Sequence, residues 1–141
     1  MRPESINALP GRFRVVTLLV ACLAAAATAS AQFGHPLKGT WLGDWGQNKT
    51  TRTHILLEIH WDGKALAGTI NPGPNGVNLQ KAIVDPETWT VHFEADGKDS
   101  SGATVHYVID GKLENLGAYE RFITGTWMEG SKKGDFKVTR S

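Results

Sequence analysis

The 141-residue chain has little cysteine and lacks any strongly apolar run long enough to cross a membrane. Its one cysteine is Cys22, near the N-terminus. A membrane-spanning helix needs about 20 consecutive apolar residues, whereas the longest apolar run, VVTLLVACLAAAATA at 15–29, is shorter and rich in alanine. The sequence therefore predicts no membrane span, and it excludes a scaffold held together by disulfide bonds.

An excess of charge of one sign is also missing. The chain has 15 Lys and Arg residues and 14 Asp and Glu residues. Residues 1–31 contain three Arg and one Glu, so 12 basic and 13 acidic residues remain in 32–141. Proteins that bind nucleic acid or anionic membranes concentrate positive charge, so this balance predicts neither partner.

The familiar sequence signatures of catalysis are absent. The chain has no Gly-x-Ser-x-Gly nucleophile elbow, no His-Glu-x-x-His zinc motif and no phosphate-binding Gly-x-x-x-x-Gly-Lys. Its Asp and Glu residues are scattered over turns and the polar faces of strands. This favours a binding or interaction role over catalysis and predicts no cofactor, while an enzyme whose carboxylates meet only on folding stays open.

The first 31 residues have the order of a secretory signal peptide. A basic leading segment precedes the apolar run, with arginines at Arg2, Arg12 and Arg14. The run ends in the small residues Ala-Ser-Ala at 29–31. The sequence therefore predicts a signal peptide over 1–31 and a secreted or periplasmic domain over 32–141.

Lipoprotein processing is the alternative to simple secretion. Leu-Val-Ala-Cys at 19–22 resembles the lipobox of bacterial lipoproteins, which would leave the mature chain anchored at Cys22. The residues after Cys22 are apolar, whereas a lipoprotein usually continues with a polar tether, so simple secretion is preferred.

Strand signals dominate the rest of the chain. THILLEIHW at 53–61 and TWTVHFEA at 88–95 alternate apolar and polar residues, which is typical of strands with one dry and one wet face. Turn sequences such as Asp62-Gly63 separate them. Eight strands are predicted, at 38–46, 53–61, 64–70, 77–84, 88–95, 103–112, 120–128 and 134–140. Their short connections predict an all-β, eight-stranded antiparallel meander closed as a small barrel, with a sandwich as the alternative.

Gly-Thr followed by a large apolar residue occurs three times, as KGTW at 38–41, AGTI at 67–70 and TGTW at 124–127. The three glycines fall inside predicted strands. A strand glycine weakens packing unless the strand bends sharply or another group approaches closely. The motif is therefore interpreted as a requirement of a tight barrel.

These motifs resemble the calycin group, the lipocalin-like and avidin-like β-barrels. GTWLGDW at 39–45 is similar to the Gly-x-Trp of a lipocalin first strand, and Arg140 follows the last strand, where lipocalins often stack an arginine on that tryptophan. ITGTWMEGSKKGDFKVTR at 123–140 is similar to the last hairpin of small exported bacterial barrels of unassigned function. Gly43 and Ile70 stand where avidins carry ligand-contacting residues, so the resemblance implies no biotin site.

The five tryptophans divide between the two barrel ends. Strand direction places Trp41, Trp61 and Trp89 toward one end and Trp45 and Trp127 toward the other. The second end also holds several polar loops and is the predicted open mouth. The predicted ligand-binding residues are Trp45, Trp127, Phe93, Asn48, Arg52 and Asn75.

These features favour a binding module for a small, largely apolar ligand at the open barrel end. The alternative is a filled barrel without a ligand pocket, acting as an accessory or protein-interaction domain with a partner in the cell envelope. Packing of the two mouth tryptophans without a void would favour this alternative.

Two histidines and a glutamate form a second candidate group, as weak metal ligands. If the hairpin between the fifth and sixth strands is centred near Asp99, His92 and His106 lie directly opposite each other, with Glu94 two residues along. Cross-strand histidines with a carboxylate can bind zinc or copper. Because this face is the polar one, a solvated outer surface is the preferred interpretation, and no metal site is predicted.

Overall fold

The computed structural model describes residues 34–141, and this part of the chain is all β, without helix. The strands are β1 (Gly39–Gly46), β2 (Arg52–Trp61), β3 (Leu66–Ile70), β4 (Val77–Asp85), β5 (Thr90–Lys98), β6 (Thr104–Glu114), β7 (Phe122–Glu129) and β8 (Lys132–Arg140). The signal peptide predicted at 1–31 lies outside the described residues. Within them, no helix is both long and apolar enough to cross a membrane.

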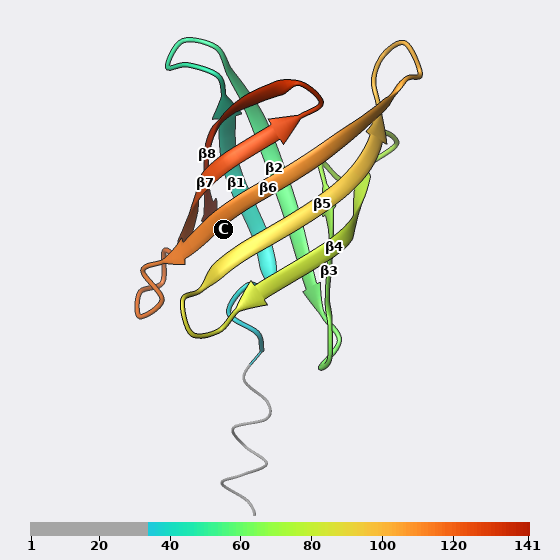
Figure 1. Cartoon of the computed structure of the whole chain (residues 1–141). Helices are drawn as coiled ribbons and strands as arrows, with labels where there is room; N and C mark the ends of the chain where they lie inside the picture. The colour runs from blue at the N-terminus through green and yellow to red at the C-terminus, as the bar shows by residue number, and fades with distance from the viewer. Residues whose placement is uncertain (1–33) are drawn as a thin grey trace, which may run out of the picture. The chain divides into compact units, whose positions relative to one another are not determined.

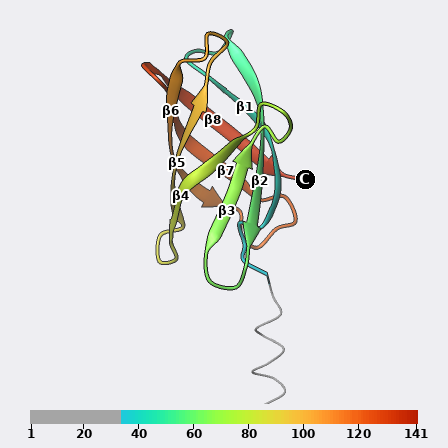
Figure 2. The same ribbon diagram turned by 90° about the vertical axis from the view of Figure 1, so that its right-hand side faces the viewer.

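Each strand pairs antiparallel with the next along the chain, and β1 also pairs with β8, so the sheet closes into a barrel (Figures 1 and 2). The predicted eight-stranded meander is confirmed, and the sandwich alternative is wrong. Closure leaves the sheet without a free edge strand, although β3 and β4 pair only at Thr69 with Asn78 and at Ile70 with Val77. The architecture is consistent with the calycin-like fold that the motifs resemble.

The barrel interior is filled by buried apolar side chains from seven strands and by partly buried ones from β4, joined by Leu37 from the segment before β1. The largest fully buried ones are Trp41, Trp127, Phe93 and Phe136. These residues alternate with polar outward ones because successive side chains of a strand point to opposite faces. Packing of this interior, rather than a disulfide, therefore stabilises the described domain.

The three motif glycines, Gly39, Gly68 and Gly125, occur where backbone or side chains approach closely. A Cβ on Gly125 would stand 2.0 Å from the carbonyl oxygen of Asp110 on β6. Gly39 has φ +136°, a conformation that other residues rarely adopt, and Arg140 passes over it. The interpretation of Gly-Thr-Trp as a requirement of barrel geometry is thus supported at these positions.

The structure corrects the prediction at both ends of the fifth strand. The predicted strand begins at Thr88, but Trp89 lies outside β5, because it has φ +57° and belongs to the turn before the strand. The strand continues to Lys98, since Asp96–Lys98 pair with β6 rather than forming the turn. The β5–β6 hairpin is consequently centred two residues later than predicted, which changes every cross-strand neighbour.

β4 and β5 part near one end of the barrel. Their pairing runs from Asp85 to Leu79, with a β-bulge between Leu79 and Lys81, and it stops there. Val77 at the start of β4 pairs only with β3, and Gly97 near the end of β5 pairs only with β6. The two strands therefore leave a gap at this end, which holds the connections β1–β2, β3–β4, β5–β6 and β7–β8. We call it the loop end.

Candidate functional site

A cleft of about 750 Å³ opens at the loop end, where β4 and β5 part. Its size is within the range of small-molecule sites. It is lined by Pro74, Asn75, Gly76, Val77, Asp96, Gly97, Lys98, Asp99, Ser100 and Thr104. We call this the loop-end cleft.

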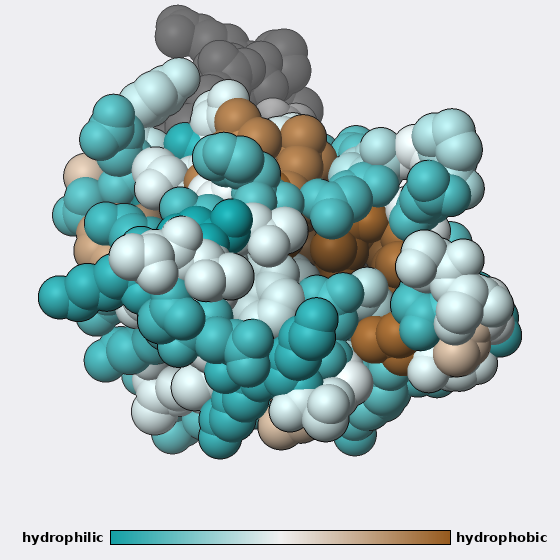
Figure 3. Space-filling view, turned by 90° about the horizontal axis from the view of Figure 1, so that it is seen from above, coloured by the Kyte–Doolittle hydropathy of each residue, from teal (hydrophilic) through white to brown (hydrophobic). Residues whose placement is uncertain are grey.

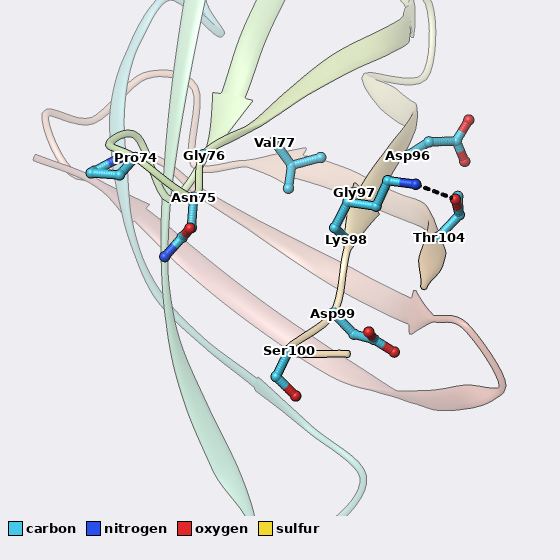
Figure 4. Close-up of a pocket in the computed structure, with 10 residues that line it drawn as sticks. All are labelled: Pro74, Asn75, Gly76, Val77, Asp96, Gly97, Lys98, Asp99, Ser100 and Thr104. Carbon is cyan, nitrogen blue, oxygen red and sulfur yellow. Dashed lines mark hydrogen bonds between the residues drawn. The ribbon is translucent and has the colours of Figure 1, made fainter. Parts of the chain in front are cut away.

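The cleft has two polar walls and a small apolar floor. Pro74 and Asn75 of the β3–β4 loop lie on one side, and Lys98 and Thr104 lie on the other, with Val77 between them (Figure 4). Figure 3 looks onto the loop end, where hydrophilic residues make up most of the surface and hydrophobic ones show in a hollow among them. The arrangement offers hydrogen-bond donors and acceptors over a limited apolar contact.

Charges of both signs meet at the second wall. Lys98 Nζ donates a hydrogen bond to Thr104 Oγ1 at 2.9 Å, which holds the ammonium group against the wall. Asp99 is committed to the turn, because its carboxylate accepts bonds from the hydroxyl and amide of Ser101 and from the amide of Ala103. These bonds, the hydroxyl bond of Ser101 first, lower the pKa of Asp99.

An aromatic layer lies beneath the cleft floor. The ring of Tyr107 stands close to Gly97, where a Cβ would meet Tyr107 Cε2 at 3.1 Å. The same ring meets Trp127 edge to face, with centroids 6.4 Å apart. Tyr107 also donates a hydrogen bond to Glu129 Oε1 at 3.2 Å. Tyr107 therefore stands between the cleft and the interior.

Trp127 has a buried indole N–H without an acceptor. Its side chain is 1% exposed. Among the described residues, only Arg121 Nε and Trp127 Nε1 are buried side-chain nitrogen atoms without a hydrogen-bond partner. A buried unsatisfied donor costs about 1–3 kcal/mol, so it marks a place where an acceptor would be stabilised.

The three aromatic residues predicted for ligand binding all lie in the barrel interior. Phe93 is fully buried, Trp127 nearly so, and Trp45 is 6% exposed and stacked on Trp127. None of the three lines the cleft. Their contribution to a ligand site stays a prediction, and it would require the layer containing Tyr107 to open.

Of the predicted polar partners, Asn75 lines the cleft and the other two serve the β1–β2 hairpin. Asn48 caps that turn by accepting hydrogen bonds from the amides of Thr50 and Thr51. Arg52 bridges two carboxylates, Asp44 at 2.6 Å and Asp135 at 2.9 Å. The structure therefore does not bring Asn48 and Arg52 together with Asn75 in the loop-end cleft.

The predicted pairing of His92 with His106 is wrong. His92 pairs with Asp110, and His106 pairs with Asp96. The two histidines are thus four residues out of register, about 13 Å along the strands at roughly 3.3 Å per residue. In the described part of the chain, no group of three His, Cys, Asp or Glu side chains is placed to hold a metal ion.

The actual register instead aligns acidic and basic side chains in one row on the outer face of β5 and β6. His92 Nδ1 lies 2.5 Å from Asp110 Oδ1, and His106 Nδ1 lies 2.6 Å from Asp96 Oδ1. The two Nε2 atoms approach different oxygens of Glu94, at 3.2 Å and 3.4 Å. We call this row the histidine ladder: Asp110, His92, Glu94, His106 and Asp96.

A second hollow lies on the outer face of β1 and β2, with a volume of about 530 Å³. It is lined by Leu42, Gly43, Asp44, His54, Ile55, Leu56 and Asn71. Leu42 is 47% exposed, which is unusual for a large apolar side chain in this domain. The groove offers an apolar contact surface outside the barrel.

The chain matches no protein-family model, and no significant match was found among the curated proteins or the solved structures. Sequence reasoning missed Lys98, Thr104, Tyr107 and Glu129, because they become neighbours of a cleft only through the gap between β4 and β5. From the sequence, only the polar loops predicted at this end of the barrel indicated where a binding site would lie.

Proposed function

We propose that this protein is a binding module that takes a small hydrophilic ligand in the loop-end cleft. The observation that carries the proposal is the cleft itself, about 750 Å³ with two polar walls, at the end of a barrel whose interior is filled. Asn75, Lys98 and Thr104 supply donors and acceptors from both walls. The apolar ligand predicted from the sequence fits this lining less well, since six of the ten lining residues are polar or charged.

The unsatisfied N–H of Trp127 supports the choice of this end. The indole that carries it meets the ring of Tyr107 edge to face, and Tyr107 in turn stands next to Gly97 of the cleft lining. A ligand that displaced Tyr107 would gain a buried hydrogen-bond donor, which gives Trp127 a place in the proposed site.

Thermal unfolding with a panel of ligands tests the proposal. The panel contains sugars, amino acids and nucleosides, with a fatty acid and haem as apolar comparisons. A hydrophilic ligand is expected to raise the Tm, because binding to the native state alone stabilises it. The combined substitution Asn75→Ala with Lys98→Ala should abolish the shift. Lys64→Ala, an exposed lysine in the β2–β3 turn, should retain it. A shift that survives the cleft substitutions, or none with any hydrophilic compound, would contradict the proposal.

A second candidate function is protein interaction through the outer face. The observation that favours it is the groove beside Leu42, together with the packed stack of Trp45 and Trp127 that fills the interior. The partner would be a protein of the cell envelope. Leu42→Lys would abolish such an interaction while leaving ligand-induced thermal shifts unchanged, so the two functions are separable.

We also propose that the barrel is exported. The support is the basic, then apolar, then small-residue order of 1–31 and the lack of cysteine in 32–141. Expression of the full chain in a bacterium should yield a product beginning at Gln32 in the periplasm or medium. Lipid attached to Cys22, lost in Cys22→Ala, would instead establish the lipoprotein alternative.

A further inference from the structure

The histidine ladder lies outside the cleft, yet it shares one residue with it. The carboxylate of Asp96 accepts a hydrogen bond from His106 Nδ1, and Asp96 also lines the loop-end cleft. Lys98 lies two residues further along β5 in the same wall of the cleft, where its ammonium group donates a hydrogen bond to Thr104. The end of the β5–β6 hairpin therefore belongs to both structures.

The ladder fixes where each histidine carries its protons. A carboxylate can only accept a hydrogen bond. The short contacts at 2.5 Å and 2.6 Å thus place a proton on Nδ1 of His92 and of His106. The second proton of each imidazolium lies on Nε2, which faces Glu94.

Glu94 lies at the centre of the row, between the Nε2 atoms of the two histidines. When both histidines are protonated, Glu94 lies between two donors and the ladder alternates negative and positive charge. When the Nε2 protons leave, two nitrogen lone pairs face the same carboxylate. Lys81 on β4, with Nζ 3.3 Å from Glu94 Oε2, is then its one remaining ion-pair partner among the described residues.

The neighbouring strands add little other charge. β4 contributes Lys81 opposite Glu94, and β7 places uncharged Thr126 and Met128 opposite Asp110 and Val108. Along β5 and β6 themselves, the row is followed by Lys98 at one end and Lys112 at the other. Loss of the two imidazolium charges is therefore not compensated from within the row.

We propose that the histidine ladder is a pH-responsive latch on the β5–β6 hairpin. It holds the hairpin end closed while His92 and His106 are protonated, and it loosens that end when they lose their Nε2 protons. Because Asp96 belongs to both, the latch also regulates the loop-end cleft, a consequence that rests on the proposed function of the cleft.

The pKa directions define the pH window. The pKa of His92 is raised mainly by its bond to Asp110, and that of His106 mainly by its bond to Asp96. Their stabilisation is therefore complete below about 6.5, the ordinary histidine value, and is lost as pH rises through the raised values. The pKa of Glu94 is lowered, first by His92, so the ladder persists until pH falls through that lowered value.

Amide hydrogen exchange by NMR tests the latch without any ligand. Exchange rates measured from pH 6 to pH 8.5 are converted to protection factors, which removes the intrinsic effect of pH. For β5 and β6 we expect protection to fall about two- to fivefold more than for β2 over this range, which is the size of effect typical of solvent-exposed ion pairs. The imidazole signals of His92 and His106 should titrate above 6.5.

Three variants make the result specific. Glu94→Gln should reduce the pH dependence without abolishing it, because the contacts with Asp110 and Asp96 still raise the pKa values of the two histidines. His106→Gln should remove the part that depends on Asp96. His54→Gln, on the outer face of β2, is the matched control and should behave like the wild-type protein.

Two results would overturn the latch. One is protection in β5 and β6 that follows β2 across the whole range. The other is Glu94→Gln with the pH dependence of the wild-type protein. Regulation of the cleft requires in addition that the amide signals of Gly97 and Lys98 follow the His106 titration. No step involves a ligand, so failure of the ligand-binding proposal would leave these outcomes unchanged.

Discussion

Trp45 on β1 and Trp127 on β7 stack inside the loop end of the barrel, with ring centroids 6.2 Å apart and planes inclined by 23°. β8 lies between their strands in the sheet, so the two rings meet over the inner face of β8. Phe136 of β8 completes the group, edge to face with Trp127 at 5.6 Å. The mouth that the sequence predicted to be open is therefore closed by aromatic packing, and the cleft lies beside it.

Trp45→Ala is expected to destabilise the domain by about 3–5 kcal/mol, because it removes a buried aromatic ring and leaves a cavity. Urea unfolding followed by circular dichroism measures the change. Tyr119→Ala is the control, since Tyr119 is 92% exposed and should be neutral. Equal stability of the two variants would show that the stack contributes little.

Gly125→Ala is expected to destabilise strongly, by about 3 kcal/mol or more, since the new Cβ would overlap the backbone of Asp110 and force β6 and β7 apart. The matched control is Gly117→Ala, where a Cβ meets nothing within 4 Å and the change should be close to neutral. Thermal unfolding compares the two. A small effect at Gly125 would refute the packing explanation of the Gly-Thr-Trp motif.

His35 should make folding stability depend on pH in the direction opposite to the ladder. Burial lowers its pKa, and its Nδ1 accepts a hydrogen bond from the amide of Leu37 while its ring packs on Trp61 at 4.7 Å. The neutral ring is thus favoured in the folded state. Its contribution is present above about 6.5 and is lost as pH falls through the lowered value.

Comparison with His35→Phe isolates this effect from the other histidines. Urea midpoints measured from pH 8 to pH 5 should fall more for the wild-type protein than for the variant. Parallel curves would mean that protonation of His35 is not coupled to folding.

Arg52→Gln should return the pKa of Asp135 toward its ordinary value. That pKa is lowered chiefly by the hydrogen bond from Arg52. Carboxyl carbon chemical shifts measured against pH report the change directly. Lys133→Gln removes the same charge from β8 and should leave Asp135 nearly unaffected, whereas an equal response would indicate general rather than paired electrostatics. High salt should weaken the Arg52 effect, because the pair is partly exposed.

Much of the fold could be predicted from local patterns. Period-two alternation, as in THILLEIHW at 53–61, predicts a strand with one buried face, and Asp62-Gly63 predicts the turn that follows it. β2 and β4 agree with their predicted bounds to within one residue. Strand direction alone predicted that Trp61 and Trp89 lie at the opposite end of the barrel from Trp45 and Trp127.

The site depended on register, which local sequence does not set. Asp96-Gly97-Lys98 has the composition of a turn, yet it continues β5 because Asp99 closes the turn through Ser101 and Ala103. A shift of two residues in the hairpin centre replaced an expected His92–His106 pair with the histidine ladder.

The sequence by itself thus determined eight antiparallel strands with one apolar face each, because alternation and turns are properties of neighbouring residues, and it left a barrel and a sandwich as the two ways to bury that face. Only the tertiary structure decided that the interior is filled, that β4 and β5 part to form a cleft, and that Asp96 serves both that cleft and the ladder. These features arise from barrel closure and cross-strand pairing, which bring together residues that are distant along the chain.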